Sequence, residues 1–167
     1  SRPPVPYDRL SINIGSTPQV KVVPGAAEHA VPVKPIHRFN NRWLALLERV
    51  RQRKEATRVV TVGGGAGGVE LTLAMQHRLR NELSAMGRDP DELQFHLFTA
   101  DAELLPTHPE PVRQAFERKL HGRGVVIHRA CPVEKVEAGQ VQTADGNARD
   151  ADEIVWVTQA GGAPWLA

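Results

Sequence analysis

The stretch with the clearest chemistry is Val62-Gly63-Gly64-Gly65-Ala66-Gly67-Gly68-Val69-Glu70, in which Gly63, Gly65 and Gly68 have the spacing G-x-G-x-x-G. Four strand-favouring residues, Val59 to Val62, precede Gly63, and a helical pattern follows the glycines. In such a turn the first glycine permits the tight bend, the second lets backbone N–H groups approach a pyrophosphate, and the third lets the helix pack on the sheet. The open N-terminus of the helix attracts phosphate groups. The sequence therefore predicts a nucleotide site formed by Gly63, Gly64, Gly65, Ala66, Gly67 and Gly68, and a glycine-rich turn without a ligand is the alternative.

Other kinds of site find little support in the 167 residues. The seven histidines and single cysteine show no metal-ligand spacing, so no metal is expected, and Cys131 is expected to be a buried small residue. Neither a G-x-S-x-G elbow nor a GxxxxGK[ST] loop occurs. The basic cluster Arg49, Arg51, Arg53 and Lys54 is interpreted as the solvated end of a helix rather than a nucleic-acid site, because the net charge is only +2.

Location is inferred from composition. The single cysteine fits a reducing compartment, and no signal peptide is visible in the proline-rich start of the chain. No apolar run approaches the roughly 20 residues that span a bilayer. We expect a cytoplasmic protein without a transmembrane segment in these residues.

The residues before the glycine turn are expected to form a strand, an irregular connection and a helix. Alternating apolar residues predict a half-buried strand over 7–15, and an irregular connection with a short strand at 20–23 follows. A helix is expected over 38–53, with Asn40 or Asn41 as its cap.

After the fingerprint we expect a helix over 67–86 and a second strand over 93–99, which complete a right-handed βαβ unit. A helix ending at Leu120 precedes a third strand at 125–128, which is apolar enough to be central in a parallel sheet. Short strands at 133–136, 140–143 and 153–158 predict an antiparallel meander. The fold class is α/β, with a central parallel sheet, flanking helices and an antiparallel β-meander.

The order of motifs resembles that of flavin-dependent pyridine nucleotide–disulfide oxidoreductases. Tyr7-Asp8-Arg9-Leu10 with Gly15-Ser16-Thr17-Pro18 resembles their YDxLxxxxGSxP segment, and the glycine turn resembles their second, NAD(P)H-binding fingerprint. Leu104-Leu105-Pro106 and Asp152-Glu153-Ile154-Val155-Trp156 follow in the family's order. The likeness is strongest to the type II NADH dehydrogenase-like branch. The run 31–36 with Phe39 and Trp43 is similar to the version associated with selenide, water dikinase.

The resemblance implies a Rossmann-like FAD/NAD(P)-binding fold and part of an FAD-dependent NAD(P)H oxidoreductase. Residues 38–158 would be the NAD(P)H domain, while 1–37 and 159–167 would be the segments that cross to and from a missing FAD domain. That FAD domain, and a selenide, water dikinase domain, are the implied partners. The parent could associate peripherally with a membrane. Alone, this piece should bind nucleotide weakly and have no turnover.

The resemblance also assigns roles to single residues. Glu70, in the first turn of the helix, would lie by the nicotinamide and flavin; the alternative is that it complements the positive helix end. Thr99 falls where an acid would hold the ribose of NAD, and Asp101 and Glu103 follow it and could serve instead. No arginine or lysine is placed for a 2′-phosphate, which favours NAD over NADP.

Two other function classes compete with an oxidoreductase. A non-catalytic nucleotide-sensing or docking module is favoured by Thr99 and by Gln159, where family members usually have an acid and a glycine. A methyltransferase with a glycine-rich loop is disfavoured by the order of elements.

Overall fold

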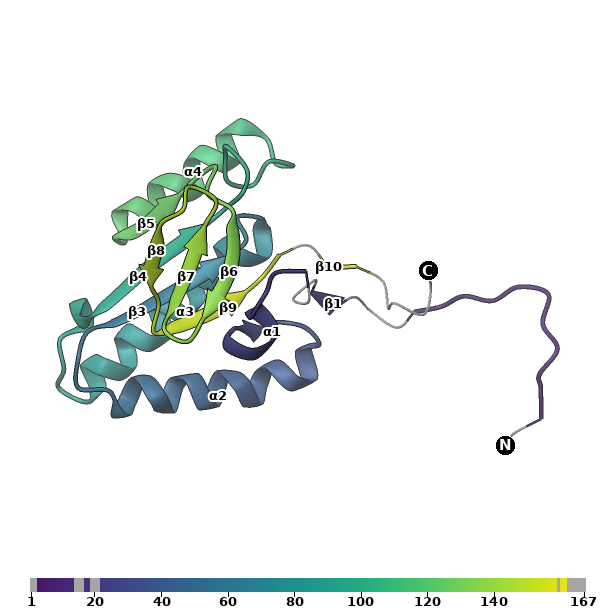
Figure 1. Ribbon diagram of the computed structural model, residues 1–167, viewed down its shortest axis with the longest axis horizontal. Coiled ribbons are helices and arrows are strands. Elements are labelled where there is room, and N and C mark those ends of the chain that lie inside the picture. Colours follow the sequence, from purple (N-terminus) through teal and green to yellow (C-terminus); the bar gives the residue numbers. More distant parts are fainter. Residues whose placement is uncertain (1–2, 14–16, 19–21, 159, 162–167) are drawn as a thin grey trace.

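The computed structural model describes residues 3–13, 17–18, 22–158 and 160–161, and its elements are labelled in Figure 1. The helices are α1 (Ala26–His29), α2 (Ile36–Gln52), α3 (Ala66–Ala85) and α4 (Glu110–Gly122), with a 3-10 turn, η1, at Pro90–Glu92. The strands are β1 (Thr17–Pro18), β2 (Val31–Pro32), β3 (Thr57–Val62), β4 (Leu93–Phe98), β5 (Val125–His128), β6 (Val133–Glu137), β7 (Gln140–Thr143), β8 (Ala148–Asp150), β9 (Glu153–Trp156) and β10 (Ala160–Gly161).

A five-stranded parallel sheet forms the middle layer, in the order β2-β9-β3-β4-β5. β3 and β4 are neighbours in register from Thr57 opposite Leu93 to Val62 opposite Phe98, and α3 connects them. The predicted βαβ unit is therefore confirmed. Because all five strands are parallel, the carboxyl ends of β3, β4 and β9 meet at one edge of the sheet, beside the glycine turn.

Two hydrophobic cores cover the two faces of this sheet, because successive strand residues point to opposite sides. Val59 of β3 packs in one core with residues of α2, α3 and α4. Its neighbour Val60 packs in the other core, with α1 and the three-stranded antiparallel sheet β6-β7-β8. The fold class is thus the predicted one: helices, parallel sheet and antiparallel meander form three layers (Figure 1).

Two strand assignments made from the sequence are wrong in position. The strand at 153–158 was expected in the meander, but β9 lies in the parallel sheet between β2 and β3, and the meander is completed by β8 instead. All four residues of β9 are buried, which is typical of a strand covered on both faces. The strand at 125–128 was expected to be central, yet among the described strands β5 pairs only with β4, at the edge of the sheet, and Val126 is 47% exposed.

The strand predicted over 7–15 does not form in residues 7–13, and residues 14–15 lie outside the described part. Residues 3–13 run away from the sheet (Figure 1), and Leu10 and Ile12 are 62% and 45% exposed. A strand needs a partner for its backbone groups, and none of the described strands reaches this segment. The strand at 20–23 is likewise absent from Val22 and Val23, while residues 20–21 are not described.

Helix α2 begins at Ile36, directly after Pro35, so neither Asn40 nor Asn41 caps it. Ion pairs fix this helix to the start of β9: the Arg49 guanidinium donates to both carboxylate oxygens of Glu153, at 2.6 and 2.7 Å. The basic cluster noted in the sequence is thus partly engaged in ion pairs within the protein. Its other paired members are Arg51, with Glu82 and Glu48, and Arg53, with Asp152.

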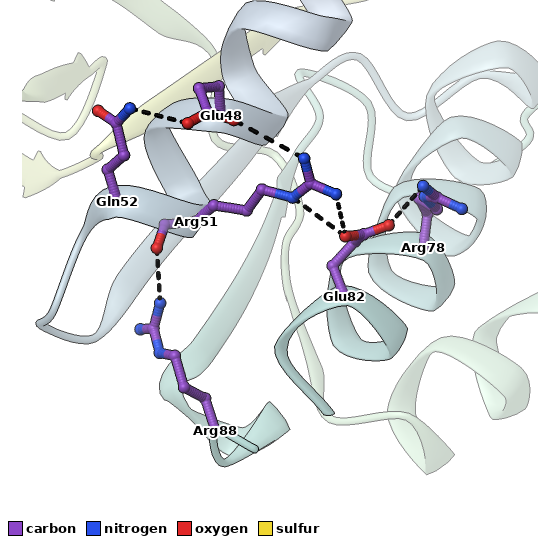
Figure 2. Close-up of polar contacts among 6 residues, drawn as sticks. All are labelled: Glu48, Arg51, Gln52, Arg78, Glu82 and Arg88. Carbon is purple, nitrogen blue, oxygen red and sulfur yellow. Dashed lines mark hydrogen bonds and ion pairs between the residues drawn. The ribbon is translucent and has the colours of Figure 1, made fainter. Parts of the chain in front are cut away.

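Figure 2 shows how α2 is joined to α3 at their exposed surfaces. Arg51 of α2 donates to one carboxylate oxygen of Glu82 on α3, at 2.5 and 3.1 Å, and Arg78 pairs with the other oxygen. Arg88, after α3, donates to the backbone oxygens of Val50 and Arg51 and so caps the last turn of α2. The network holds the two helices together on the same face of the sheet.

Candidate functional site

The glycine turn is shaped by three glycines that pack against the protein itself. Gly63 has a φ of 126°, and a Cβ there would lie 2.5 Å from the backbone oxygen of Val157. A Cβ on Gly68 would lie 1.8 Å from the oxygen of Gly63, and one on Gly64 would meet the Cβ of Thr99 at 2.5 Å. These positions therefore need glycine for the turn to close against β4, β9 and α3.

Gly65 differs from these three. A Cβ on Gly65 would have no protein atom within 4 Å, and its φ of −74° is open to any residue. It is the N-cap of α3, and no side chain caps this helix end. The first N–H groups of a helix have no partner within the helix, and they carry the positive end of its dipole. A ligand that approaches Gly65 from its open side can therefore reach the first N–H groups of α3 and the positive end of the helix dipole.

A cavity of about 710 Å³ adjoins this turn, at the carboxyl edge of the sheet. Its walls come from the glycine turn (63–65), the end of β4 and the residues after it (98–101), the end of β9 (156–158), and the segment 131–133. Val22, Val23, Val62, Pro106 and Thr107 complete the lining. Most of the described lining is apolar or backbone, and Asp101 supplies its one charged side chain.

Thr99 and Asp101, the two residues that the sequence analysis expected near the ribose, both line this cavity. Thr99 is only 4% exposed, and its backbone is held by His128, which accepts from its N–H, and by Cys131, which donates to its oxygen, both at 2.9 Å. Cys131 itself is half-buried and lines the cavity, so it is less buried than expected.

Glu70 opens onto a second cavity, of about 510 Å³. Gly67 and Leu71 of α3 line it, together with Val33 and Phe39 from the other side. Residues 156–158 border both cavities, so the two cavities adjoin at the end of β9. Ala66, which was also expected at the nucleotide, packs partly buried against the helical core instead of lining either cavity.

The expectation that Glu70 lies in the first turn of the helix is wrong. Because α3 begins at Ala66, Glu70 is its fifth residue, and the first turn holds no acidic side chain. The influence of the helix dipole falls off beyond the first turn, so charge complementation explains Glu70 less well than an exposed position on a cavity does.

A pair of histidines behind the first cavity was not anticipated. His96 Nδ1 and His128 Nε2 are 3.1 Å apart, and the His128 ring stacks on Phe98, a cavity residue, with centroids 4.1 Å apart. Burial lowers the pKa of His128 to about 4, and the charges of His96 and Arg149 act in the same direction against a smaller opposite effect of an aspartate. Burial, with Arg58 and Arg149, also lowers the pKa of His96. His128 lies opposite Phe98 in the register of β4 and β5, and His96 lies two residues before Phe98 on the same face of the sheet, a proximity visible only once the strand register is known.

No group of three or more potential metal ligands occurs in the described ranges. Among the same residues, no helix has the length and apolar character needed to cross a membrane. Gln159 lies outside the described residues.

Comparison with known proteins places these features in a family. The model of the pyridine nucleotide-disulphide oxidoreductase family matches residues 2–163, nearly the whole chain. The chain belongs to this family. The resemblance noted in the sequence is therefore confirmed for the family.

Two curated proteins are similar over most of the chain. A type II NADH:quinone oxidoreductase of Haemophilus influenzae is 30% identical over 175 residues, which cover 91% of this chain and 39% of that protein. A probable NADH dehydrogenase of Dictyostelium discoideum is 24% identical over 170 residues, covering 95% of this chain and 38% of that protein. The chain thus spans about two fifths of the length of these relatives.

Solved structures share the fold. NDH2 from Plasmodium falciparum, determined in complex with NADH, has a TM-score of 0.73 at 17% identity, covering 90% of this chain and 34% of that chain. The water-forming NADH oxidase from Lactobacillus brevis, bound to NADH, has a TM-score of 0.68 at 21% identity, covering 92% of this chain and 31% of that chain. The α/β architecture with a parallel sheet is therefore that of pyridine nucleotide-disulphide oxidoreductases.

Proposed function

We propose that this chain is the NAD(P)H-binding domain of a flavin-dependent oxidoreductase, and that it positions the nicotinamide for hydride transfer to FAD. The observation that carries the proposal is the open side of Gly65 at the uncapped N-terminus of α3, facing a cavity of about 710 Å³. A Cβ at this position would fill the space through which a pyrophosphate reaches the helix donors.

The residues present fit a dinucleotide. The glycine turn would hold the pyrophosphate, and the first cavity, with Thr99 and Asp101, would hold the adenosine half. The nicotinamide half would then extend past 156–158 toward Gly67 and Glu70, which line the second cavity. The cofactors supply the hydride chemistry, and the contribution of these residues is to bind and orient the nicotinamide.

The relatives support a nicotinamide substrate. The curated relatives are named for NADH oxidation, and two structures of the same fold were determined with NADH. We propose NAD(P)H, with NADH favoured, as the ligand of this chain, and FAD as the cofactor of the parent.

The sequence assigns 38–158 to the NAD(P)H domain and 1–37 and 159–167 to the crossing segments. Because α1 packs in the second core and β2 pairs with β9, we further propose that this domain extends over 22–158 and that the flanking residues cross to an FAD domain of the parent. The antiparallel pairing of β1 with β10 supports this division, because it brings the two crossing segments side by side, away from the main sheet (Figure 1). The FAD domain is the proposed partner. A selenide, water dikinase domain as a second partner, and a cytoplasmic parent with peripheral membrane association, are proposals that rest on sequence resemblance alone.

One observation favours a second candidate function, a non-catalytic module that senses nucleotide or docks a partner. Thr99, at the end of β4, is not acidic and is buried, so the usual ribose contact is missing at that place. The two candidates differ in the parent protein, because only the oxidoreductase would carry bound FAD.

The purified chain tests the proposal directly. We expect NADH to quench the fluorescence of Trp156, which lines both cavities, while the chain carries no flavin and does not oxidise NADH. Absorbance near the flavin bands and at the NADH band measures the last two points. Stoichiometric flavin together with NADH oxidation would show that the chain is a complete enzyme, and no NADH binding would remove the nucleotide site itself.

A further inference from the structure

The segment between β4 and α4 is joined to the glycine turn by a backbone hydrogen bond. The N–H of Leu105 donates to the oxygen of Gly64 at 2.9 Å. The Leu105 side chain is only 2% exposed and packs in the core on the helical side of the sheet, so the residue that makes this bond is itself anchored. The middle of the glycine turn is therefore held by a residue that follows the next strand of the sheet.

The backbone of Leu105 has an unusual conformation. Its φ is 53°, in the left-handed region that a leucine rarely adopts. Among the described residues other than glycine, only Ala130, with a φ of 46°, shares this feature. The N–H of Ala130 donates to the oxygen of Asp101 at 2.9 Å, so it too holds a residue that lines the first cavity. Such conformations persist only where the surrounding structure imposes them, and they cluster at ligand sites.

The hydrogen bond from Leu105 sets the orientation of the peptide group between Gly64 and Gly65. A trans peptide is planar, so its C=O and its N–H point in opposite directions. Because the oxygen of Gly64 points to Leu105, the N–H of Gly65 points away from that residue. In the part of the chain that the structure describes, this N–H has no acceptor, and Gly65 lines the first cavity.

We infer that Leu105 is a positioning residue for the phosphate groups of the nucleotide: its N–H fixes the peptide between Gly64 and Gly65, so that the N–H of Gly65 is presented to the pyrophosphate. The inference rests on the proposed function. The opposite orientation of this peptide would present the oxygen of Gly64, which repels an anion. Holding the donor in place before the ligand arrives removes the need to order it on binding.

The test separates the backbone conformation of residue 105 from the packing of its side chain. Leu105→Ile keeps the size of the side chain but adds a branch at Cβ, which makes the left-handed conformation much less favourable. Leu105→Met keeps an unbranched apolar side chain of similar size. Leu105→Gly adopts the left-handed conformation freely but loses the buried side chain.

Isothermal calorimetry with NADH measures binding, and urea unfolding measures stability. Leu105→Ile should weaken NADH binding by at least about fivefold, while Leu105→Met and Leu105→Gly should stay within about threefold of the wild type. Leu105→Gly should nevertheless be the least stable of the three, because it leaves a cavity in the core. The orders of affinity and stability therefore differ, which a residue that only stabilises the fold would not produce.

Leu93→Ile is the matched control. Leu93 is also 2% exposed and lies in the same core, but its φ is −94° and it lines neither cavity. This variant should bind NADH like the wild type.

Nuclear magnetic resonance of the isotope-labelled chain observes the two amide groups directly. In the wild type, the Leu105 amide should exchange slowly with solvent, and the Gly65 amide resonance should shift when NADH is added. Leu105→Ile should speed the exchange at residue 105 and reduce the shift at Gly65.

The outcomes separate this inference from the proposed function. If the wild type binds NADH, unchanged affinity in a folded Leu105→Ile protein would overturn the role of Leu105. Equal loss of affinity in Leu93→Ile, or losses at residue 105 that follow the loss of stability, would overturn it too and leave the nucleotide site in place. Failure of the wild type to bind NADH would overturn the proposed function and this inference together.

Discussion

Four glycines of the fingerprint turn, at positions 63, 64, 65 and 68, differ in how closely other protein atoms approach them. Gly63, Gly64 and Gly68 each face protein atoms closer than 3 Å from a would-be Cβ, whereas Gly65 faces open space. The sequence predicted the turn because its spacing is local. It could not show that Gly64 packs on Thr99, since that contact joins two strands of the sheet. Nor could it show that Glu103, rather than Asp101, pairs with Arg113 of α4.

The histidine pair makes the stability of the protein depend on pH. The pKa of His128 is lowered from 6.5 to about 4 by burial, so the unfolded chain binds more protons than the folded one between these values. This contribution is fully present above about pH 6.5 and is lost as the pH falls toward 4. Urea unfolding at pH 7 and pH 5 should show a loss of about 1 kcal/mol from this group, after allowance for solvent screening of a half-buried ring.

Variants identify the source of that loss. His128→Gln should make the difference in unfolding free energy between pH 7 and pH 5 smaller by about 1 kcal/mol. His77→Gln, on the exposed surface of α3, is the matched control and should leave the difference unchanged. If His128→Gln unfolds with the same pH dependence as the wild type, the pair does not titrate as described.

At the scale of elements, α2 is fixed to the sheet by one pair that is partly buried. The Glu153 side chain is 8% exposed, and Arg49 is its ion-pair partner. Arg49→Met should lower the free energy of unfolding by about 2 kcal/mol, because it leaves a buried carboxylate without a partner. Denaturant unfolding measures the change.

The control uses the same substitution in the network of Figure 2. Glu82 also pairs with Arg78, so Arg51→Met leaves that carboxylate with a partner and should cost no more than about 1 kcal/mol. An equal effect of the two substitutions would show that Glu153 does not depend on Arg49 as its partner.

The positions of helices and strands along the chain were predicted better than the order of the strands in the sheet. Helices α2, α3 and α4 and the strands β3, β4 and β5 follow from local periodicity, which a single sequence displays, whereas the short helix α1 lies in a segment that was expected to be irregular. The place of β9 does not, because a parallel strand finds its partners far along the chain, and the turn at Asp145 suggested that 153–158 continued the meander. The strand expected over 7–15 failed for a related reason: alternation shows which face is apolar, but not what covers it.

At the scale of the whole molecule, the two cores and the cavities lie within 22–158, while β1 and β10 pair beside the main body (Figure 1). Glu70 lines the second cavity with Val33 and Phe39, and Asp101 lines the first cavity. The proposed dinucleotide would reach from the first cavity to the second, with its nicotinamide end near Glu70.

The most direct test of a nucleotide site at the uncapped end of α3 is NADH titration of Gly65→Asp. A side chain fits at Gly65, and aspartate is a favourable N-cap, so the free energy of unfolding should stay the same or rise by up to about 0.5 kcal/mol. The new carboxylate would occupy the proposed pyrophosphate position and repel the negatively charged pyrophosphate, so NADH affinity should fall by at least about tenfold. Gly122→Asp, at another open glycine remote from the cavities, should bind NADH like the wild type. Unchanged NADH affinity in a folded Gly65→Asp protein would contradict the account.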